Sequence, residues 1–225
     1  MSSFFHRYRI GSLAAAGVLI ALAVGTSACA DPAADKPKAT VGAPSNAAPT
    51  SPAPTSSGGR VIALTHLNTS VEFTGSKVTG SHEGYFKKLS GSVQLDPASV
   101  EKSSVNVEID TTSVTTDADG LTEHLKSADF FDVVKFPKAA FSSTKITAKP
   151  GEKGSTHEVT GDFEIHGVKK SITFPASIVR SGDAVAMQAE FSINRKDFGI
   201  VYAGKADDLI RDNVVLKLTL NTAAK

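Results

Sequence analysis

Apolar and polar residues alternate with a period of two over most of the chain after residue 60, which is typical of β-strands with one buried face. In one such run Val105, Val107 and Ile109 alternate with the polar residues Asn106 and Glu108. The other runs place on a common face Val71 and Phe73; Val93 and Leu95; Val159, Phe163 and Ile165; Ile172, Phe174, Ala176 and Ile178; Val185, Met187, Ala189, Phe191 and Ile193; and Val214, Leu216, Leu218 and Leu220. The pattern therefore predicts an all-β domain.

The segment Gly120–Asp132 departs from this alternation. Leu121, Leu125 and the Phe130-Phe131 pair predict a short helix followed by a loop. Some seven to nine antiparallel strands must then cover their apolar faces with a second sheet or by closing on themselves. A sandwich fills its middle with side chains, whereas an eight-stranded barrel can also hold one elongated small molecule, and the alternation leaves both open.

Two segments precede this domain. Residues 1–28 run from basic residues through an uncharged apolar stretch to small residues, the order of a signal peptide. Residues 29–59 hold six of the ten prolines of the chain among Ala, Ser and Thr, with almost no large apolar residue. Such a composition predicts a disordered tether, with a glycosylated stalk as the alternative, and the folded domain then covers residues 60–225.

Cys29, the only cysteine, directly follows the predicted signal peptide. The sequence Thr26-Ser27-Ala28-Cys29 resembles a bacterial lipobox, whose cysteine is diacylated and becomes the mature N-terminus. Ordinary secretion, with cleavage after the small residues Ala28-Cys29-Ala30, is the alternative. We expect an extracytoplasmic lipoprotein, anchored through lipidated Cys29 to the outer face of the cell membrane, and otherwise a secreted or periplasmic protein.

Charge and chemistry narrow the function. A net charge of +1 argues against nucleic acid as a partner, because a phosphate backbone demands a basic excess. The single cysteine precludes an intramolecular disulfide or a Cys-based zinc cluster, and the histidines show no paired spacing for a metal. No G-x-S-x-G elbow is present, so we expect no catalytic residue and no metal or cofactor.

Several ordered motifs carry a family resemblance. They are Ile109–Thr116, the stretch from His124 to Val133 with Lys135-Phe136-Pro137 and Phe141 after it, Val159–Lys170, and Ile193–Ile200. Together they resemble the YceI-like, polyisoprenoid-binding family, and a series of motifs in order is more specific than any single one. The resemblance implies a lipocalin-like, extended eight-stranded antiparallel β-barrel with one short helical insert, found in exported bacterial proteins.

The resemblance also implies a long isoprenoid chain in the apolar interior. The inward residues that we expect along such a tunnel are Val105, Val107, Ile109, Phe163, Phe174, Ile178, Phe191, Ile193, Leu216, Leu218 and Leu220. Three aromatics of the irregular segment, Phe130, Phe131 and Phe136, are expected either to gate the mouth or to plug it. Ordinary core packing is the alternative for each inward residue.

The leading hypothesis is a non-enzymatic carrier, storage or scavenging protein for a polyisoprenoid or isoprenoid quinone. Its partners are that lipid and, through the anchor, the cytoplasmic membrane; a homodimer is left open. The alternative is a tethered barrel that binds a protein or a cell-envelope component through its loops. An enzyme acting on such a lipid is a third reading. Arg195 and Asp197 are expected to form a structural ion pair, or to contact a polar head group.

Overall fold

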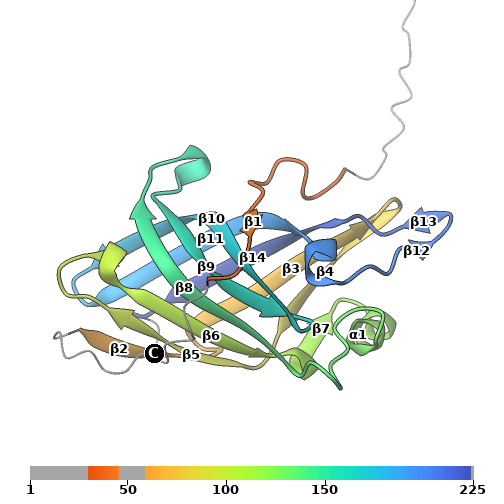
Figure 1. The fold of residues 1–225 in the computed structure, drawn as a ribbon, viewed down its shortest axis with the longest axis horizontal. Helices are drawn as coiled ribbons and strands as arrows, with labels where there is room; N and C mark the ends of the chain where they lie inside the picture. The colour runs from red at the N-terminus through yellow and green to blue at the C-terminus, as the bar shows by residue number, and fades with distance from the viewer. Residues whose placement is uncertain (1–29, 46–58, 224–225) are drawn as a thin grey trace, which may run out of the picture.

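The computed structural model describes residues 30–45 and 59–223, so the predicted signal peptide and Cys29 lie outside the described residues. Within these ranges the protein is almost entirely β, with one short α-helix, α1 (Asp119–Lys126) (Figure 1). The strands are β1 (Thr40–Gly42), β2 (Arg60–Leu64), β3 (Thr69–Lys77), β4 (Gly80–Phe86), β5 (Leu89–Leu95), β6 (Ser104–Asp110), β7 (Val114–Thr116), β8 (Lys138–Ala148), β9 (His157–Ile165), β10 (Val168–Ser181), β11 (Ala184–Asn194), β12 (Gly204–Lys205), β13 (Asp208–Leu209) and β14 (Asn213–Asn221). No helix among the described residues is long and apolar enough to cross a membrane.

The strands form one strongly curled antiparallel sheet, a half-barrel, in the order β2-β5-β6-β8-β9-β10-β11-β14-β3-β4-β7. β1 adds to β10 outside this order, and β12 and β13 form a separate two-stranded arm. Only two residues, Lys87 and Lys88, separate β4 from β5, although the two strands stand near opposite ends of the order. The covalent link between them therefore forces the sheet to curl.

The predicted count of eight strands is not confirmed. Over the described residues the curled sheet has eleven strands in its main order, and β1 is a twelfth. In three places a short bend separates two consecutive strands. Residues 65–68 separate β2 from β3, two lysines separate β4 from β5, and a 3₁₀ turn at Thr111–Ser113 separates β6 from β7. At such a bend the buried positions change between even and odd numbers, as from Phe86 in β4 to Val93 in β5, and this shift does not show which strands pair with one another.

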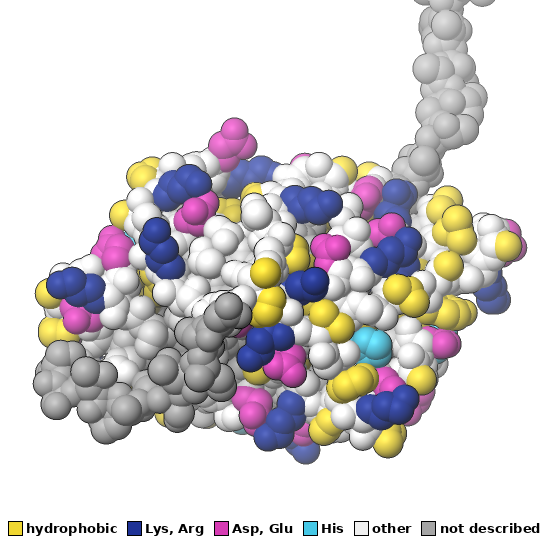
Figure 2. Space-filling view, in the orientation of Figure 1, with side chains coloured by type: hydrophobic (Ala, Val, Ile, Leu, Met, Phe, Trp, Pro, Cys, Tyr) yellow, Lys and Arg dark blue, Asp and Glu magenta, His cyan; other side chains and the backbone are white. Residues whose placement is uncertain are grey.

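A strand forms at each alternating run that was named, because the run buries its apolar face on the inside of the curl, whereas β1, β2, β4, β8, β12 and β13 lie outside those runs. Every second residue is buried from Val159 to Ile165 in β9 and from Ile172 to Ile178 in β10, and Phe174 lies opposite Val159 across the ladder. The outer side is polar: Figure 2 shows basic and acidic side chains interspersed over the visible face. The core of the domain is therefore the concave side of one sheet.

The helical insert is confirmed as a short helix followed by a loop. Leu125 is buried on α1, and the backbone turns back so that the amide of Phe131 donates to the carbonyl oxygen of Leu125 at 3.0 Å. Phe130 and Phe131 are buried next to it. This segment covers one end of the curled sheet.

Residues 30–45 differ from the predicted disordered tether. β1 pairs with β10, placing Thr40 opposite Thr173, and Ala33 and Ala39 are buried. The prediction of disorder rested on the lack of large apolar side chains. This segment is held largely by backbone hydrogen bonds, which the hydrophobicity of a sequence does not indicate. The part of the tether from 46 to 58 lies outside the described residues.

Candidate functional site

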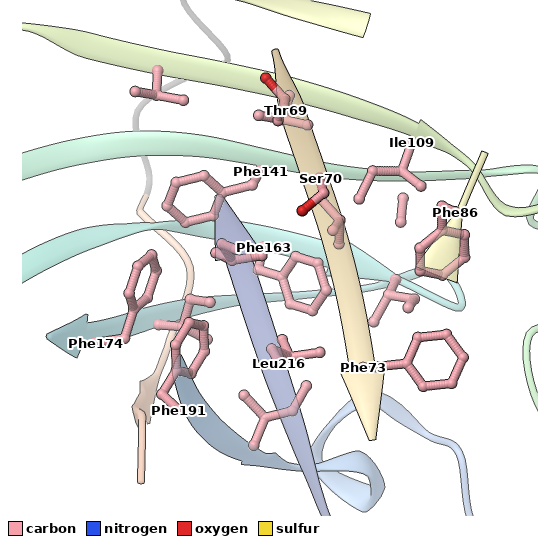
Figure 3. Close-up of a pocket in the computed structure, with 18 of the residues that line it drawn as sticks. Thr69, Ser70, Phe73, Phe86, Ile109, Phe141, Phe163, Phe174, Phe191 and Leu216 are labelled. Carbon is pink, nitrogen blue, oxygen red and sulfur yellow. The ribbon is translucent and has the colours of Figure 1, made fainter. Parts of the chain in front are cut away.

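The concave face encloses an apolar cavity with a volume of about 220 Å³ (Figure 3). Of the 39 described residues that line it, 33 are apolar, so the cavity offers a ligand almost no polar partner. Along β14 the lining residues run from Val214 to Leu220, which at the rise of a β-strand is a length of about 20 Å. The cavity is therefore suited to a long apolar molecule.

Most residues that the sequence singled out do line this cavity. They are Val105, Val107, Ile109, Phe130, Phe131, Phe163, Phe174, Ile178, Phe191, Ile193, Leu216, Leu218 and Leu220. They come from five strands and from the loop after α1, and the register of the sheet brings them together. Alternation within each strand identified all of them except Phe130 and Phe131, which lie in the irregular segment.

Phe136 is the exception and a correction. It does not line the cavity; its ring lies edge-on to His166 at 5.0 Å and over the turn at Gly167. A Cβ on Gly167 would come within 2.4 Å of this ring, and the φ of +72° at Gly167 also favours glycine. Phe136 therefore covers the β9–β10 hairpin from outside the cavity.

Phenylalanine rings line the cavity along its length. Phe174 and Phe191 are stacked with centroids 4.2 Å apart and planes 9° apart, and Phe141 lies 5.7 Å from Phe174. Farther along, Phe163 meets the fully buried Phe198 edge-on at 5.2 Å. Tilted and stacked rings at these distances attract one another, so they form a wall of fixed shape.

Sequence reasoning missed several of these rings. Phe73, Phe86 and Phe141 line the cavity, and the first two lie 5.8 Å apart. Two glycines carried a signal for them: a Cβ on Gly84 would come within 2.3 Å of Phe73, and one on Gly161 within 2.5 Å of Phe141. A glycine inside an alternating strand indicates a close approach from a neighbour.

The end of the cavity below α1 is filled by aromatic side chains. Phe131 lies 5.7 Å from Phe86 and 6.2 Å from Phe73, while Phe130 meets His124 and Tyr202. Of the two expectations, gate or plug, the burial of both rings matches a plug in this structure.

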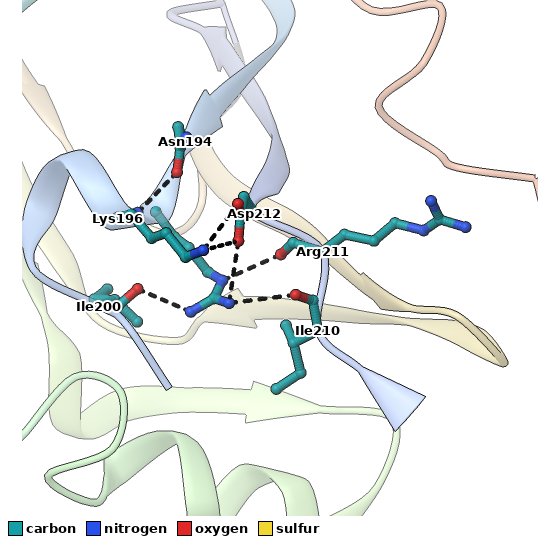
Figure 4. Close-up of polar contacts among 7 residues, drawn as sticks. Asn194, Lys196, Ile200, Ile210, Arg211 and Asp212 are labelled. Atoms are coloured by element: carbon teal, nitrogen blue, oxygen red, sulfur yellow. Dashed lines mark hydrogen bonds and ion pairs between the residues drawn. The ribbon is translucent and has the colours of Figure 1, made fainter. Parts of the chain in front are cut away.

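Arg195 is the one charged residue among the described residues that line the cavity, and it is 4% exposed. Its guanidinium donates to three carbonyl oxygens: Nη1 to that of Ile200 at 2.8 Å, Nε to that of Arg211 at 3.1 Å and Nη2 to that of Ile210 at 3.3 Å (Figure 4). Asp212 Oδ1 lies 3.5 Å from Nη2. The side chain therefore ties the 3₁₀ turn Arg195–Phe198 to the start of β14.

The predicted ion pair between Arg195 and Asp197 is wrong in its partner, which is Asp212. The pairing of β14 with β11 places Asn213 opposite Asn194 and so brings Asp212 next to Arg195. Burial lowers the pKa of Arg195 and the charge of Asp212 opposes this shift. A guanidinium nevertheless stays charged near neutral pH, and its carbonyl partners make it a structural cross-link.

The other polar groups on the lining are hydroxyls. Ser70 Oγ and Thr219 Oγ1 are 2.7 Å apart and satisfy one another, and Ser70 also bonds Glu72. Within the described part of the chain, no cluster of three or more His, Cys, Asp or Glu side chains could hold a metal ion. Apart from Arg195 and these hydroxyls, the side chains that line the cavity are apolar.

Several known proteins are similar to this chain in sequence or in structure. The chain is 36% identical over 123 residues to protein YceI of Escherichia coli O6:H1, covering 52% of this chain and 62% of that protein. It is 37% identical over 132 residues to a UPF0312 protein of Pseudomonas putida (strain W619), covering 53% and 67%. The chain thus spans less than two thirds of the length of the E. coli relative.

Two solved structures share the fold. One is BcnA of Burkholderia cenocepacia, with a TM-score of 0.58 and 25% identity over 68% of this chain and 95% of that one. The other, described as a polyisoprenoid binding domain from Saccharophagus degradans implicated in plant cell wall breakdown, has a TM-score of 0.56 and 16% identity over 72% and 98%. At that identity the second likeness shows the fold alone.

Fold and cavity together define an all-β protein in which one curled antiparallel sheet encloses an elongated apolar cavity. The sequence profile of the YceI-like domain matches residues 63–222, more than half of the chain. The chain belongs to the family of YceI-like domains, which confirms the resemblance seen in its motifs.

Proposed function

We propose that the protein binds a long apolar isoprenoid lipid, a polyisoprenoid or an isoprenoid quinone, inside the curled sheet, as a non-enzymatic carrier, storage or scavenging protein. The observation that carries the proposal is the lining: 33 apolar residues of 39 described, with its one cation held by carbonyl groups of the protein itself. An uncharged hydrocarbon chain is the ligand class that leaves none of these groups unpaired.

The energetics support a hydrocarbon ligand. Each methylene-sized group that leaves water contributes about 0.8 kcal/mol, so a chain of several isoprene units gains affinity along its whole length. Aromatic rings that already contact one another lose little freedom when the ligand enters, which keeps the cost of binding low. The description of the S. degradans domain as polyisoprenoid-binding names the same ligand class.

We further propose that the protein acts outside the cytoplasm, attached to the cell membrane through Cys29. Support comes from the sequence alone, namely the basic, apolar and small-residue order of residues 1–28. A mass spectrum of the intact mature protein tests this point, since diacylation adds the mass of a glycerolipid to a chain that begins at Cys29. A mature chain of unmodified mass that retains Cys29 excludes the lipid anchor.

Ligand binding is tested by organic extraction of the purified protein followed by mass spectrometry, with Leu218→Trp as the variant. Leu218 lines the cavity, so an indole there takes the space of the lipid. Lys217→Trp is the matched control, because Lys217 is the next residue on β14 and faces solvent, with 55% of its side chain exposed. We expect isoprenoid in extracts of the wild type and of the control but not of Leu218→Trp. The absence of isoprenoid from all three would refute the proposal.

A further inference from the structure

The wall of the cavity is split where β10 and β11 diverge. Their ladder runs from the Ser181–Ala184 pair to the Ser177–Gln188 pair and ends there. Beyond this point, which we call the fork, β10 continues beside β9 and β11 continues beside β14. Pro175, which has no N–H to donate, stands on β10 at the fork, where a strand without its neighbour tolerates proline.

Residues 37–42 fill the fork. Ser192 of β11 donates to the carbonyl oxygen of Pro37 and accepts from the amide of Ala39, both at 2.8 Å. On the other side β1 pairs antiparallel with residues 171–173 of β10. The segment thus runs parallel to β11 and antiparallel to β10, and both strands recover part of the hydrogen bonding that they lose by diverging.

The segment lies beside residues that line the cavity, although residues 37–42 do not line it themselves. Its neighbours are Ile172, opposite Val41 in the register, and Phe191, which is fully buried and adjacent to Ser192. Phe191 stacks on Phe174 across the fork. Removing residues 37–42 would therefore expose the cavity lining between β10 and β11.

The wall is thin at this place. A second cavity of about 280 Å³ lies beside the segment and is lined by Pro37, Pro175 and Ser177, among others. Leu218 and Thr219 line both this cavity and the main one. Both residues belong to β14, the neighbour of β11, so beside the fork one strand contributes to the two cavities.

The attachment of the segment is weak compared with the rest of the sheet. Its apolar anchors are the small residues Ala39 and Val41, with Ala33 buried before it. The residues that precede it form partly exposed ion pairs, Lys36–Glu190 at 3.1 Å, Asp31–Arg211 at 3.7 Å and Asp35–Lys153 at 3.6 Å. After it, the amide of Ser45 donates to Asp162 Oδ1 at 2.9 Å. Exposed ion pairs contribute little, and elements with few buried apolar contacts open first.

The two ends of the cavity are crossed by contacts between segments that are distant along the chain. One is filled by Leu125, Phe130 and Phe131, with Arg195 nearby tying the turn after β11 to the start of β14. At the other, Arg180 of β10 donates to the carbonyl oxygen of Asp96, which follows β5, at 2.8 Å. An extended lipid would have to break these contacts to pass.

We propose that residues 37–42 are a detachable wall strand, whose release opens the fork and admits the apolar ligand sideways into the cavity. The inference rests on the proposed function, because it assigns a route to that ligand. A long flexible chain can pass through a lateral slit segment by segment, whereas passage through an end requires it to thread along its whole length.

The first test locks the strand. Thr40→Cys with Thr173→Cys, in a chain that also carries Cys29→Ser, places two thiols on paired residues of β1 and β10. Thr173 lies between the cavity residues Ile172 and Phe174 and so faces outward. The matched control is Glu72→Cys with Lys217→Cys, an outward pair on β3 and β14 that already forms an ion pair.

The measurement is the rate at which each protein takes up all-trans-retinol, a fluorescent isoprenoid alcohol. We expect the oxidised Thr40–Thr173 protein to take up retinol at least about tenfold more slowly than its reduced form, because the strand can no longer leave. The control pair should show the same rate in both redox states. Equal rates for the oxidised and reduced lock would overturn the proposal and place the route at an end of the cavity.

Amide hydrogen exchange provides a readout that does not depend on a ligand. The amides of Ala39 and Ser192 bond only across the fork, so we expect them to exchange at least about 100-fold faster than that of Phe163 in β9. If the amides of Ala39 and Ser192 exchange as slowly as that of Phe163, the proposal of a detachable strand is wrong, whatever the rates of retinol uptake. Fast exchange at Ala39 with no retinol binding to any form would instead overturn the proposed function, and with it the route.

Discussion

Along β9 and β14 the wall of the cavity is a long ladder with large apolar side chains on its inner face, whereas at the fork it is completed by residues 37–42, whose apolar anchors are Ala39 and Val41. The first region excludes water by burying rings and branched chains. The second is held by backbone hydrogen bonds and surface ion pairs. One wall thus contains a part that unfolds only with the whole protein and a part that can leave alone.

The largest effect that separates the two regions is expected from Phe163→Ala. Phe163 is buried in β9 and its ring contacts Phe198, so its removal leaves a hole in the continuous wall. We expect the free energy of unfolding to fall by about 3–5 kcal/mol, measured by urea denaturation. Glu164→Ala, on the outward position next to it, should change it by less than about 0.5 kcal/mol. A loss below 1 kcal/mol for Phe163→Ala would mean that the wall is not a packed core.

Arg195→Met is expected to rank second. The thioether side chain keeps the apolar volume but leaves the carbonyl groups of Ile200, Ile210 and Arg211 without their donor. The free energy of unfolding should fall by about 2–3 kcal/mol, because buried acceptors lose their partner. Lys196→Met is the control: Lys196 also contacts Asp212 but is exposed. If both variants lose the same amount, the cross-link by Arg195 is not what holds this end.

Ala39→Glu tests whether residues 37–42 can detach at the fork while the rest of the sheet stays folded. A carboxylate cannot be buried at this position, so the segment should detach instead of straining the sheet. The free energy of unfolding should then fall by only about 1 kcal/mol, while the amide of Ser192 loses its protection against exchange. The control is Lys38→Glu at the neighbouring exposed position, which should leave the amide of Ser192 protected against exchange. A loss as large as that of Phe163→Ala would show that the two regions unfold together.

The smallest effect is expected from Lys36→Ala. Lys36 forms an ion pair with Glu190 at 3.1 Å, in which both side chains are partly exposed. We expect a change in the free energy of unfolding of about 0.5 kcal/mol or less, and a modest rise in the exchange rate of Ala39 that high salt reproduces in the wild type. Exchange that is insensitive to salt would show that the backbone hydrogen bonds alone hold the segment.

Much of the cavity could be predicted from the sequence because burial in a strand repeats every second residue. Val105, Phe163, Phe191 and Leu218 belong to different strands, yet each was identified from its own neighbours. Phe136 could not be placed in this way, because it lies in an irregular segment where no period tells which side is inward. Its contact with Gly167 arises only when the β9–β10 hairpin is formed.

The number of strands and the partner of Arg195 also lay beyond the sequence. A bend such as the one at Lys87 and Lys88 shifts the apolar pattern by one residue, and this shift does not show that the strands on its two sides pair with different neighbours. Asp212 is distant along the chain from Arg195 and becomes its neighbour only through the pairing of β11 with β14. The strand count and the ion-pair partner both depend on which segments pair in the folded sheet, and the composition of the chain does not determine that pairing.

By itself the sequence determined the all-β class, the inward residues and the family, because alternation and ordered motifs are local properties of the chain. Only the tertiary structure decided that β10 and β11 part at a fork and that residues 37–42, poor in large apolar side chains, complete the wall there. The physical reason is that this segment is held by main-chain groups. Every residue but proline carries the same donor and acceptor, so nothing in the sequence marks where they will find partners.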